Sequence, residues 1–150
     1  MASCEEIREF FSNDTYAIHT GIYIDEAANG EAVCSFEIKD YHMNSGGAVQ
    51  GGAIFTLADF TFAVAANSLG KMTVSVNNNI SYLRPAKGKK LIGKSKCLGR
   101  TKRMCFYEVY ITDDIGTEVA KMSVTGYIKN IDNFTNSNEE CNCKDVNIRR

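Results

Sequence analysis

The stretch HMNSGGAVQGGAIFTLADFTFAVAANSLG, residues 42–70, contains the longest nearly unbroken apolar run in this chain of 150 residues. Between residues 53 and 66 only Thr56, Asp59 and Thr61 interrupt the run, so a helix built here is apolar almost all round. Such a helix must be buried, and its length of roughly 21 Å is too short for a membrane span of about 20 residues. We therefore expect a central helix inside a protein core.

The single charge in this run is the carboxylate of Asp59. A carboxylate without partners in a dry interior is costly, so its presence indicates a functional use. The helix start, Gln50-Gly51-Gly52, supplies no Ser, Thr, Asp or Asn cap, and we expect its N–H groups to remain available to a carbonyl oxygen or an anion. The alternative is that the two glycines only relieve crowding at a packed turn.

The composition describes one ordinary globular domain. Hydrophobic residues make up 44% of the chain and the net charge is −1, so the chain can bury a core and offers no general positive charge to nucleic acid. The acidic first segment lacks the apolar core of a secretory signal and predicts a short amphipathic helix with Ile7, Phe10 and Phe11 facing inward. We therefore expect a cytoplasmic protein that contacts neither a membrane nor nucleic acid.

The cysteines favour free thiols over a disulfide framework. Four of the six stand singly: Cys4, Cys34, Cys97 and Cys105. Scattered cysteines in apolar patterns are typical of buried thiols. The pair Cys141-Asn142-Cys143 has a spacing that could hold a soft metal or form a redox pair, but no histidine or second cysteine pair lies near it to complete a zinc site. We predict no metal site and no cofactor.

Strand patterns occupy most of the remaining chain. Residues 16–39 predict a hairpin around Asn29-Gly30, a strong two-residue turn signal, and we expect His19 within it to be structural. Alternation predicts four further strands, at about residues 72–82, 90–98, 104–112 and 118–128. Strands joined by turns favour an antiparallel sheet, and the economical α+β architecture is one sheet curved around the central helix.

The predicted domain spans residues 1–129, and residues 130–150 form a polar tail that we expect to be flexible or loosely docked. In the strand at residues 72–82, alternation places five apolar residues on one face with Asn78 among them: Met72, Val74, Val76, Ile80 and Tyr82. The other face is small and polar, and we expect most of it to be solvated: Thr73, Ser75, Asn77, Asn79 and Ser81.

Several motifs between residues 40 and 128 resemble those of the hotdog-fold acyl-CoA thioesterases of the PaaI-like group, in which a sheet wraps one long central helix. His42-x-Asn44-x-x-Gly47 is similar to that family's H-x-N-x-x-G loop, with Gly46 as the other possible alignment for the glycine. Leu57-Ala58-Asp59 looks like its L-A-D signature, and residues 75–85 resemble its segment ending in Tyr-x-x-Pro-Ala. The motifs are fairly specific together and weak singly.

The resemblance implies a thioester hydrolase that converts acyl-CoA to a free acid and CoA thiol. Asp59 would act as general base or nucleophile, and the Gly51 amide would polarise the thioester carbonyl. Asn44 would help to position the carbonyl or the water, and Ser75 would orient the water or support Asp59. The chemistry agrees, since hydrolysis needs an oxyanion donor at the carbonyl and a carboxylate within reach of water.

The spacing of two of these residues predicts a shared site. Gly51 and Asp59 are separated by roughly 12 Å along one helix, so one helix cannot bring both to a single carbonyl. Two antiparallel helices across a two-fold axis can, so we predict a homodimer in which Asn44 and Gly51 of one subunit face Asp59 and Ser75 of the other. A homotetramer, as a dimer of dimers, is the larger assembly that we expect.

Further residues are candidates for substrate binding: Gln50, Gly52, His42, Arg100, Lys102 and Arg103. Gln50 stands where the family usually has histidine, which affects rate and substrate preference more than the reaction, because the assigned base is Asp59. A loop histidine such as His42 is more often structural than catalytic. The three cations in the 100–103 turn are the preferred contacts for CoA phosphates, and the lysines of residues 87–90 are the alternative.

Two other functions stay open. One is a non-catalytic hotdog domain that binds acyl-CoA as a sensor or regulator, although no signalling segment accompanies it. The other is a hotdog dehydratase, which would normally use a histidine where this chain has Gln50. The acyl group is undetermined, because Phe55, Phe60 and Phe62 could line an acyl pocket or simply belong to the core. A carrier-protein thioester is an alternative to CoA.

Overall fold

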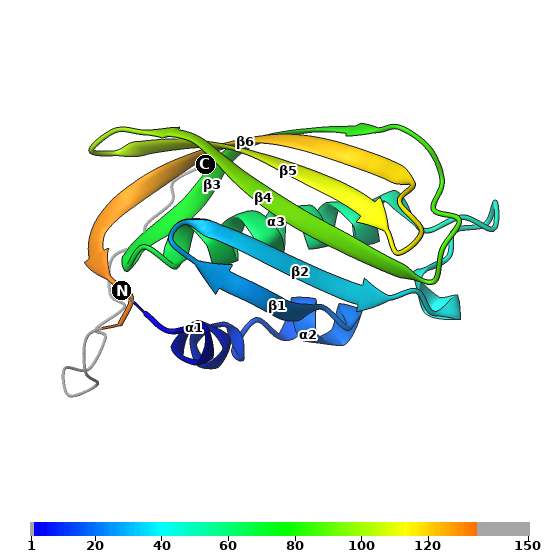
Figure 1. The fold of residues 1–150 in the computed structure, drawn as a ribbon, viewed down its shortest axis with the longest axis horizontal. Helices are drawn as coiled ribbons and strands as arrows, with labels where there is room; N and C mark the ends of the chain where they lie inside the picture. The colour runs from blue at the N-terminus through cyan, green and yellow to red at the C-terminus, as the bar shows by residue number, and fades with distance from the viewer. Residues whose placement is uncertain (1, 135–150) are drawn as a thin grey trace, which may run out of the picture.

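The computed structural model of the protein describes residues 2–134 (Figure 1). Two short helices come first, α1 (Cys4–Phe11) and α2 (Thr15–Thr20), followed by strands β1 (Tyr23–Ala28) and β2 (Glu31–Glu37). A single 3-10 turn, η1 (Asp40–His42), leads into the long helix α3 (Gly51–Asn67). Four strands complete the fold: β3 (Lys71–Tyr82), β4 (Lys90–Arg100), β5 (Met104–Asp113) and β6 (Glu118–Asp132).

The six strands form one antiparallel sheet in the order β1-β2-β4-β5-β6-β3. The sheet curves around α3, which lies along its concave side (Figure 1). This confirms the predicted architecture of a sheet wrapped around one central helix. Among the described residues, β1 and β3 are the two edges of the sheet, and each pairs with one neighbouring strand.

Helix α3 is the centre of the core. Leu57 and Val64 are fully buried against the sheet. Gly93 of β4 allows the close approach, because a Cβ atom there would lie 2.5 Å from the Thr61 hydroxyl oxygen. The helix is less completely covered than predicted, since one stripe stays partly exposed: Gly52, Ala53, Phe55, Thr56, Asp59 and Ala63. Helix α2 and residues of η1 border this side of the helix.

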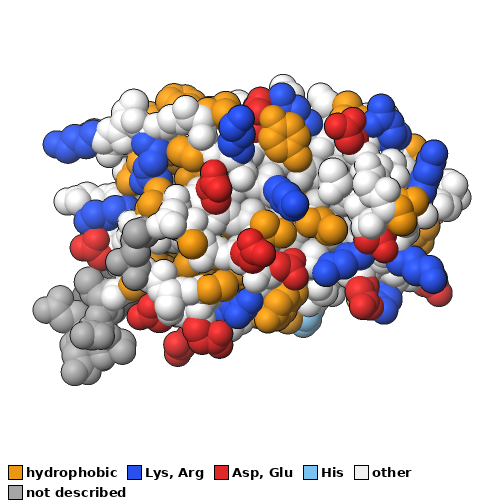
Figure 2. Space-filling view, viewed as in Figure 1, with side chains coloured by type: hydrophobic (Ala, Val, Ile, Leu, Met, Phe, Trp, Pro, Cys, Tyr) orange, Lys and Arg blue, Asp and Glu red, His pale blue; other side chains and the backbone are white. Residues whose placement is uncertain are grey.

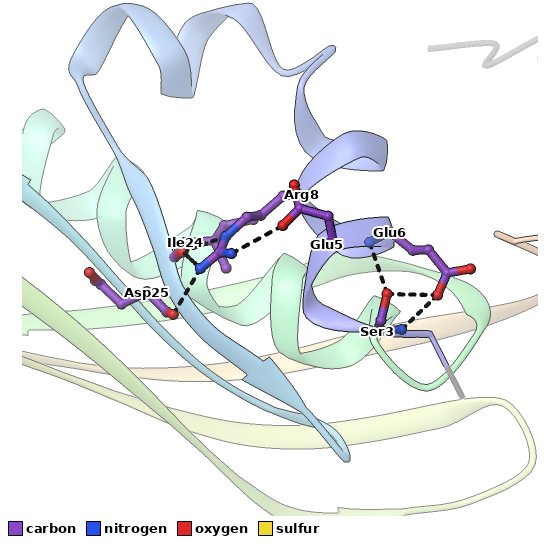
Figure 3. A network of polar contacts seen from close by, with 6 residues as sticks. All are labelled: Ser3, Glu5, Glu6, Arg8, Ile24 and Asp25. Carbon is purple, nitrogen blue, oxygen red and sulfur yellow. Dashed lines mark hydrogen bonds and ion pairs between the residues drawn. The ribbon is translucent and has the colours of Figure 1, made fainter.

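Helix α1 lies below β1 in Figure 1, and Figure 3 shows the polar contacts of this helix. Ser3 and Glu6 form a capping box at its start. The Arg8 guanidinium donates hydrogen bonds to the Ile24 carbonyl at 2.9 and 3.0 Å and to the Asp25 carbonyl at 3.1 Å. Ile7 is fully buried, as predicted, whereas Phe10 and Phe11 are half-buried.

The segment at residues 16–20 is helical, so the prediction of a strand there is wrong. Asp14 caps α2, its carboxylate accepting the N–H of Ala17 at 3.1 Å, and Gly21 ends the helix with a φ of 87°. A cap and a left-handed glycine at this spacing stabilise one short helix. The hairpin that follows is confirmed, with Asn29 and Gly30 in the left-handed region, as a two-residue turn requires.

A bulge in β3 reverses the predicted faces of its first half. The register with β6 shifts between Ser75 and Asn77, so one extra residue lies on the β3 side. Thr73 therefore points inward and is buried, while Val74 and Val76 are exposed, which contradicts the prediction for these three residues. Beyond the bulge the predicted face is correct, and Asn78 lies on the side that faces α3.

The end of the domain lies beyond the predicted boundary at residue 129. Strand β6 runs to Asp132, and the Asn133 N–H donates to the Gly70 carbonyl at 3.0 Å. Phe134 packs edge-on against Phe10, with ring centroids 5.6 Å apart. The first residues of the predicted tail are therefore docked, whereas residues 135–150, including the Cys141 and Cys143 pair, lie outside the described residues.

The four cysteines that the structure describes are free, as predicted. Cys34 and Cys105 are buried, whereas Cys4 and Cys97 are partly exposed. Burial raises the pKa of the Cys34 thiol to about 12, which keeps it protonated and unreactive at neutral pH.

Candidate active site

The N-terminal end of α3 begins the candidate site. Gln50 caps the helix with its own side chain, whose oxygen accepts the N–H of Gly52 and, at 3.3 Å, the N–H of Ala53. The expectation that all of these donors stay available is therefore wrong, because a glutamine can fold back onto the first turn. Among the described residues no group accepts the N–H of Gly51, so this donor alone remains for a ligand.

Tyr82 of β3 lies directly over Gly51. Its hydroxyl donates to the Gly51 carbonyl at 3.0 Å, and a Cβ atom at Gly51 would lie 3.3 Å from the tyrosine ring. The glycine thus lets the strand and the helix start approach closely. This contact was not predicted, since the sequence indicated only that Tyr82 shares a strand face with other apolar residues.

The loop before α3 is held by His42. The His42 Nδ1 accepts the backbone N–H of Lys39 at 2.9 Å, so the proton is on Nε2, which donates to the Thr20 carbonyl at 2.7 Å. The ring is 4% exposed and joins the end of α2 to η1. With both nitrogens engaged, His42 supports the loop and offers no free nitrogen to a substrate.

Asn44 shapes the same loop. Its side-chain oxygen accepts the N–H groups of Gly46 at 2.9 Å and Ala48 at 3.1 Å, forming an Asx turn. Gly47 completes the turn with a φ of 78°. The Asn44 amide nitrogen has no partner among residues 2–134, so it is the part of this side chain that could contact a substrate.

Asp59 lies on the half-exposed stripe of α3, two turns beyond Gly51. Its Oδ1 accepts a hydrogen bond of 2.9 Å from the Asn78 side-chain nitrogen. The expected support from Ser75 is not observed within the described chain, where that hydroxyl makes no hydrogen bond to Asp59. The structure brings Asn78 to Asp59 instead, and the one sequence signal for it was a polar residue on an otherwise apolar strand face.

Two cavities lie end to end along the exposed stripe of α3. The first, about 470 Å³, is lined by residues that include Gln50, Gly52 and His19. The second, about 310 Å³, is lined by residues that include Asp59. Tyr16 and Thr56 border both cavities. A groove therefore runs from the helix start to the carboxylate, with α2 as a wall that the sequence did not predict, and His19 belongs to its lining.

A third cavity, about 540 Å³, lies near the other end of α3 and is basic. Four cations line it: Lys71, Lys102, Arg103 and Lys129. Lys71 pairs with Asp132 at 2.6 Å, whereas the other three have no ion-pair partner within residues 2–134. Arg100 is not part of the lining. Several Lys and Arg side chains are visible at this end of the molecule in Figure 2.

The alternative cationic loop, residues 87–90, is held in place by hydrogen bonds from its backbone to two aspartates. The carboxylate of Asp113 accepts the N–H groups of Lys87 at 2.8 Å and Gly88 at 2.9 Å, and Asp114 accepts that of Lys89 at 2.8 Å. Burial acts to raise the pKa of Asp113, but the backbone donors outweigh burial and hold that pKa well below its usual range. This loop is thus part of the scaffold.

The described part of the chain offers neither a metal site nor a membrane span. Residues 2–134 contain no cluster of three His, Cys, Asp or Glu side chains that could hold a metal ion. Over the same residues no helix has the length and apolarity needed to cross a bilayer.

Comparisons with known proteins point to one family. The family described as "Thioesterase superfamily" matches residues 46–120, which is half of the chain. The chain is 31% identical to acyl-coenzyme A thioesterase PaaI of Escherichia coli strain K12 over 111 residues, covering 73% of this chain and 79% of that protein. It is 33% identical to acyl-coenzyme A thioesterase 13 of Homo sapiens over 95 residues, covering 61% and 68% of the two chains.

Solved structures support the same assignment. The structure of the E. coli PaaI protein from the phenylacetic acid degradation operon has a TM-score of 0.78 and 27% identity, covering 81% of this chain and 89% of that one. A hypothetical thioesterase with coenzyme A from Streptococcus pneumoniae TIGR4 has a TM-score of 0.74 and 26% identity, covering 82% and 96%. The predicted hotdog fold and the resemblance to PaaI-like thioesterases are confirmed, and the chain belongs to the thioesterase superfamily.

Proposed function

We propose that the protein is an acyl-CoA thioesterase that hydrolyses its substrate in sites shared between two subunits. The observation that carries this proposal is the groove on α3, which starts at the first helical turn beside Gly51 and has the carboxylate of Asp59 near its other end. The N–H of Gly51 has no acceptor among residues 2–134. This N–H and the Asp59 carboxylate are the two groups that thioester hydrolysis requires, an oxyanion donor and a base. Relatives named as acyl-coenzyme A thioesterases support the choice of substrate.

The two groups lie too far apart to act within one chain. They are separated by roughly 12 Å along α3, whereas both must come within about 3 Å of the reacting atoms. The exposed stripe of α3 and the free edge of β3 are surfaces that a second copy could cover. A homodimer with antiparallel α3 helices places Gly51 and Asn44 of one subunit opposite Asp59 and Ser75 of the other.

The chemistry then follows in two steps. Asp59 accepts a proton from a water molecule while the water oxygen attacks the thioester carbonyl carbon. The Gly51 N–H, at the positive end of the helix dipole, stabilises the oxyanion that forms. The carbon–sulfur bond breaks, and the CoA thiolate leaves and takes up a proton. If Asp59 attacks the carbonyl directly, the CoA thiolate leaves from an acyl–Asp59 anhydride, and water then attacks the Asp59 carbonyl carbon and releases the acid. A single turnover in ¹⁸O-water tests this route, because water oxygen then enters the Asp59 carboxylate, which the general-base route leaves unlabelled.

The basic cavity is the proposed contact for the CoA phosphates. In an antiparallel dimer the C-terminal end of one α3 lies beside the N-terminal end of the other, which brings this cavity of one subunit toward Gly51 of its partner. Lys102 and Arg103 line this cavity and remain the proposed phosphate contacts, with Lys129 as a further cation beside them. Arg100 does not line the cavity and is no longer proposed as a contact. Replacing Lys102 and Arg103 by alanine should raise KM for acyl-CoA several-fold; an unchanged KM would exclude this cavity.

Two dimers could pair through the outer face of the sheet, as a homotetramer requires. That face exposes several apolar side chains: Val74, Val76, Leu98 and Phe106. Contiguous exposed apolar groups are typical of interaction surfaces. Sedimentation of the intact protein measures the mass of the assembly, and a monomer with full activity would rule out the shared site.

Release of free thiol from a panel of acyl-CoA substrates tests the reaction itself. We expect turnover by the wild type and a loss of about 10²- to 10⁴-fold in kcat for Asp59→Asn and Asp59→Ala, with the melting temperature retained. Tight acyl-CoA binding without turnover would favour the sensor instead. Hydration of an enoyl thioester would favour the dehydratase, although Gln50 uses its side chain to cap α3. Matched acyl carrier protein substrates test the alternative thioester.

A further inference from the structure

Asn78 is the one residue of the described chain that hydrogen-bonds to the Asp59 carboxylate. Its Nδ2 donates to Asp59 Oδ1 at 2.9 Å, yet its own Oδ1 is buried and accepts no hydrogen bond among residues 2–134. A buried carbonyl oxygen without a donor is unfavourable and calls for an explanation. The amide is therefore oriented by its contact with Asp59 rather than by its other surroundings.

The alternative orientation of the amide is disfavoured by charge. Turning the side chain over would place its oxygen against the ionised Asp59 oxygen, where both atoms are acceptors. The observed orientation satisfies the carboxylate and leaves the amide oxygen without a partner. An apolar residue of similar size would avoid that unpaired oxygen, so a purely structural role does not account for asparagine at this position.

The bulge in β3 turns the side chain of Asn78 toward Asp59 on α3. Before the bulge, Thr73 faces inward and is held by Asn67 of α3, whose side chain makes two hydrogen bonds of 2.9 Å with the Thr73 backbone. Without the extra residue between Ser75 and Asn77, the alternation that starts at Thr73 would turn Asn77 inward instead. The bulge therefore aims the amide of Asn78 at the helix.

We propose that Asn78 is a positioning residue for thioester hydrolysis, holding Asp59 Oδ1 so that Oδ2 is presented to the attacking water. This inference rests on the proposed function. The hydrogen bond from Asn78 and the bulge in β3 together determine which oxygen of Asp59 reacts.

Few other titratable groups face Asp59. The cavity around it is also lined by Asp14 and Tyr16 of the α2 segment, and by no Lys, Arg or His side chain. The Asp14 Oδ1 accepts the N–H of Ala17 at 3.1 Å. Helix α3 carries no second charged residue, and no charged residue of β3 lines this cavity. Within the described chain, Asn78 is thus the group whose removal changes the hydrogen bonding of Asp59.

The test compares Asn78→Leu and Asn78→Asp with the matched control Asn79→Leu, which makes the same change on the exposed face of the same strand. For Asn78→Leu we expect kcat to fall about tenfold while KM for acyl-CoA stays unchanged, because the base loses its orientation and substrate binding does not. The melting temperature should stay the same or rise, since an unpaired buried oxygen is removed. Asn78→Asp should lower kcat further, because an ionised carboxylate offers no donor to Asp59 and repels it. The control should match the wild type.

A second readout separates this inference from the proposed function. The side-chain ¹³C signal of Asp59 can be recorded by NMR at neutral pH in the intact protein without any substrate. Its chemical shift should change in Asn78→Leu and keep the wild-type value in Asn79→Leu. A changed chemical shift in a protein without thioesterase activity would remove the proposed function and keep the link between Asn78 and Asp59. An unchanged chemical shift together with a lowered melting temperature would make Asn78 a structural residue and overturn the inference, whatever the activity.

Discussion

Two carboxylates in this protein have opposite surroundings. Asp113, at the β5–β6 turn, is 2% exposed and accepts four backbone N–H groups, from Lys87, Gly88, Ile115 and Thr117, at 2.7 to 3.2 Å. Asp59, on α3, is half-exposed, borders a cavity and accepts one side-chain hydrogen bond. The first carboxylate has no lone pair left for a substrate, whereas the second keeps an oxygen available.

The kind of hydrogen-bond donor distinguishes a structural carboxylate from a catalytic one more clearly than burial does. Backbone donors cannot move without unfolding a turn, so Asp113 fastens the 87–90 loop to the β5–β6 turn. A single side-chain donor fixes the orientation of Asp59 and leaves its second oxygen for proton transfer. We therefore expect changes around Asp59 to alter rate with little loss of stability, and changes at Asp113 to do the reverse.

After Asp59 itself, the largest effect is expected at Gly51, its proposed partner. Gly51→Pro removes the N–H that the oxyanion would use, and proline is tolerated at the first position of a helix. Gln50 precedes it with φ −63° and ψ 134°, an extended conformation that proline accepts in its neighbour. We expect kcat for acyl-CoA hydrolysis to fall about 10²- to 10³-fold.

Gly51→Ala is the matched control for that variant. It adds the same Cβ atom, which must fit 3.3 Å from the Tyr82 ring, but keeps the N–H. Its kcat should therefore stay well above that of Gly51→Pro. Equal losses in the two variants would mean that crowding against Tyr82, and not the missing donor, lowers the rate, and the oxyanion role of Gly51 would be wrong.

The next effect concerns which chain supplies each group. Gly51→Pro and Asp59→Ala subunits, carrying different tags, can be coexpressed and the mixed dimers purified. If each site takes Gly51 from one subunit and Asp59 from the other, a mixed dimer has one fully damaged site and one intact site. We expect roughly half of the wild-type kcat per dimer, although each parent variant is nearly inactive.

Sites built within single chains would give a different result. Every site in the mixed dimer would then carry one damaging substitution, and activity would stay at the level of the parents. The measurement therefore tests the shared site directly, while equal melting temperatures for parents and mixed dimers would show that assembly is intact.

The part of this site that follows from local sequence could be predicted, and the part that depends on strand register could not. The apolar run at residues 53–66 fixes α3 whatever surrounds it, and Asp59 was identified because it is the one charge there. The inward turn of Asn78 depends on a bulge, which forms against β6 and leaves no mark in the alternation of β3.

Short polar contacts account for the other errors. Gln50 is not a usual helix cap, and its role depends on a side chain that folds back onto the first turn. Helix α2 is only six residues long, so hydrophobic periodicity is too weak to reveal it, and Asp14 and Gly21 were the available signals. The sequence therefore predicted α3, along which the groove runs, but not α2, which borders it.

The smallest effect on rate is expected at Asp113. Asp113→Asn replaces an acceptor that faces four backbone N–H groups by an amide whose own N–H₂ opposes some of them. We expect the free energy of unfolding to fall by about 1–3 kcal/mol at pH 7, measured by urea denaturation, with kcat per folded molecule unchanged. Asp59→Asn should show the opposite result, because Asp113→Asn loses stability and keeps its rate, whereas Asp59→Asn loses rate and keeps its stability.

The pH dependence of that loss has a definite sign. Because the folded protein holds the pKa of Asp113 well below its usual range, the carboxylate contributes stability above the unfolded-state pKa of about 4 and loses it as the pH falls toward the folded-state value. The stability difference between wild type and Asp113→Asn should therefore be full at pH 7 and shrink below about pH 4. A difference that stays constant down to pH 2 would mean that packing, and not the charge held by the backbone donors, is what Asp113 contributes.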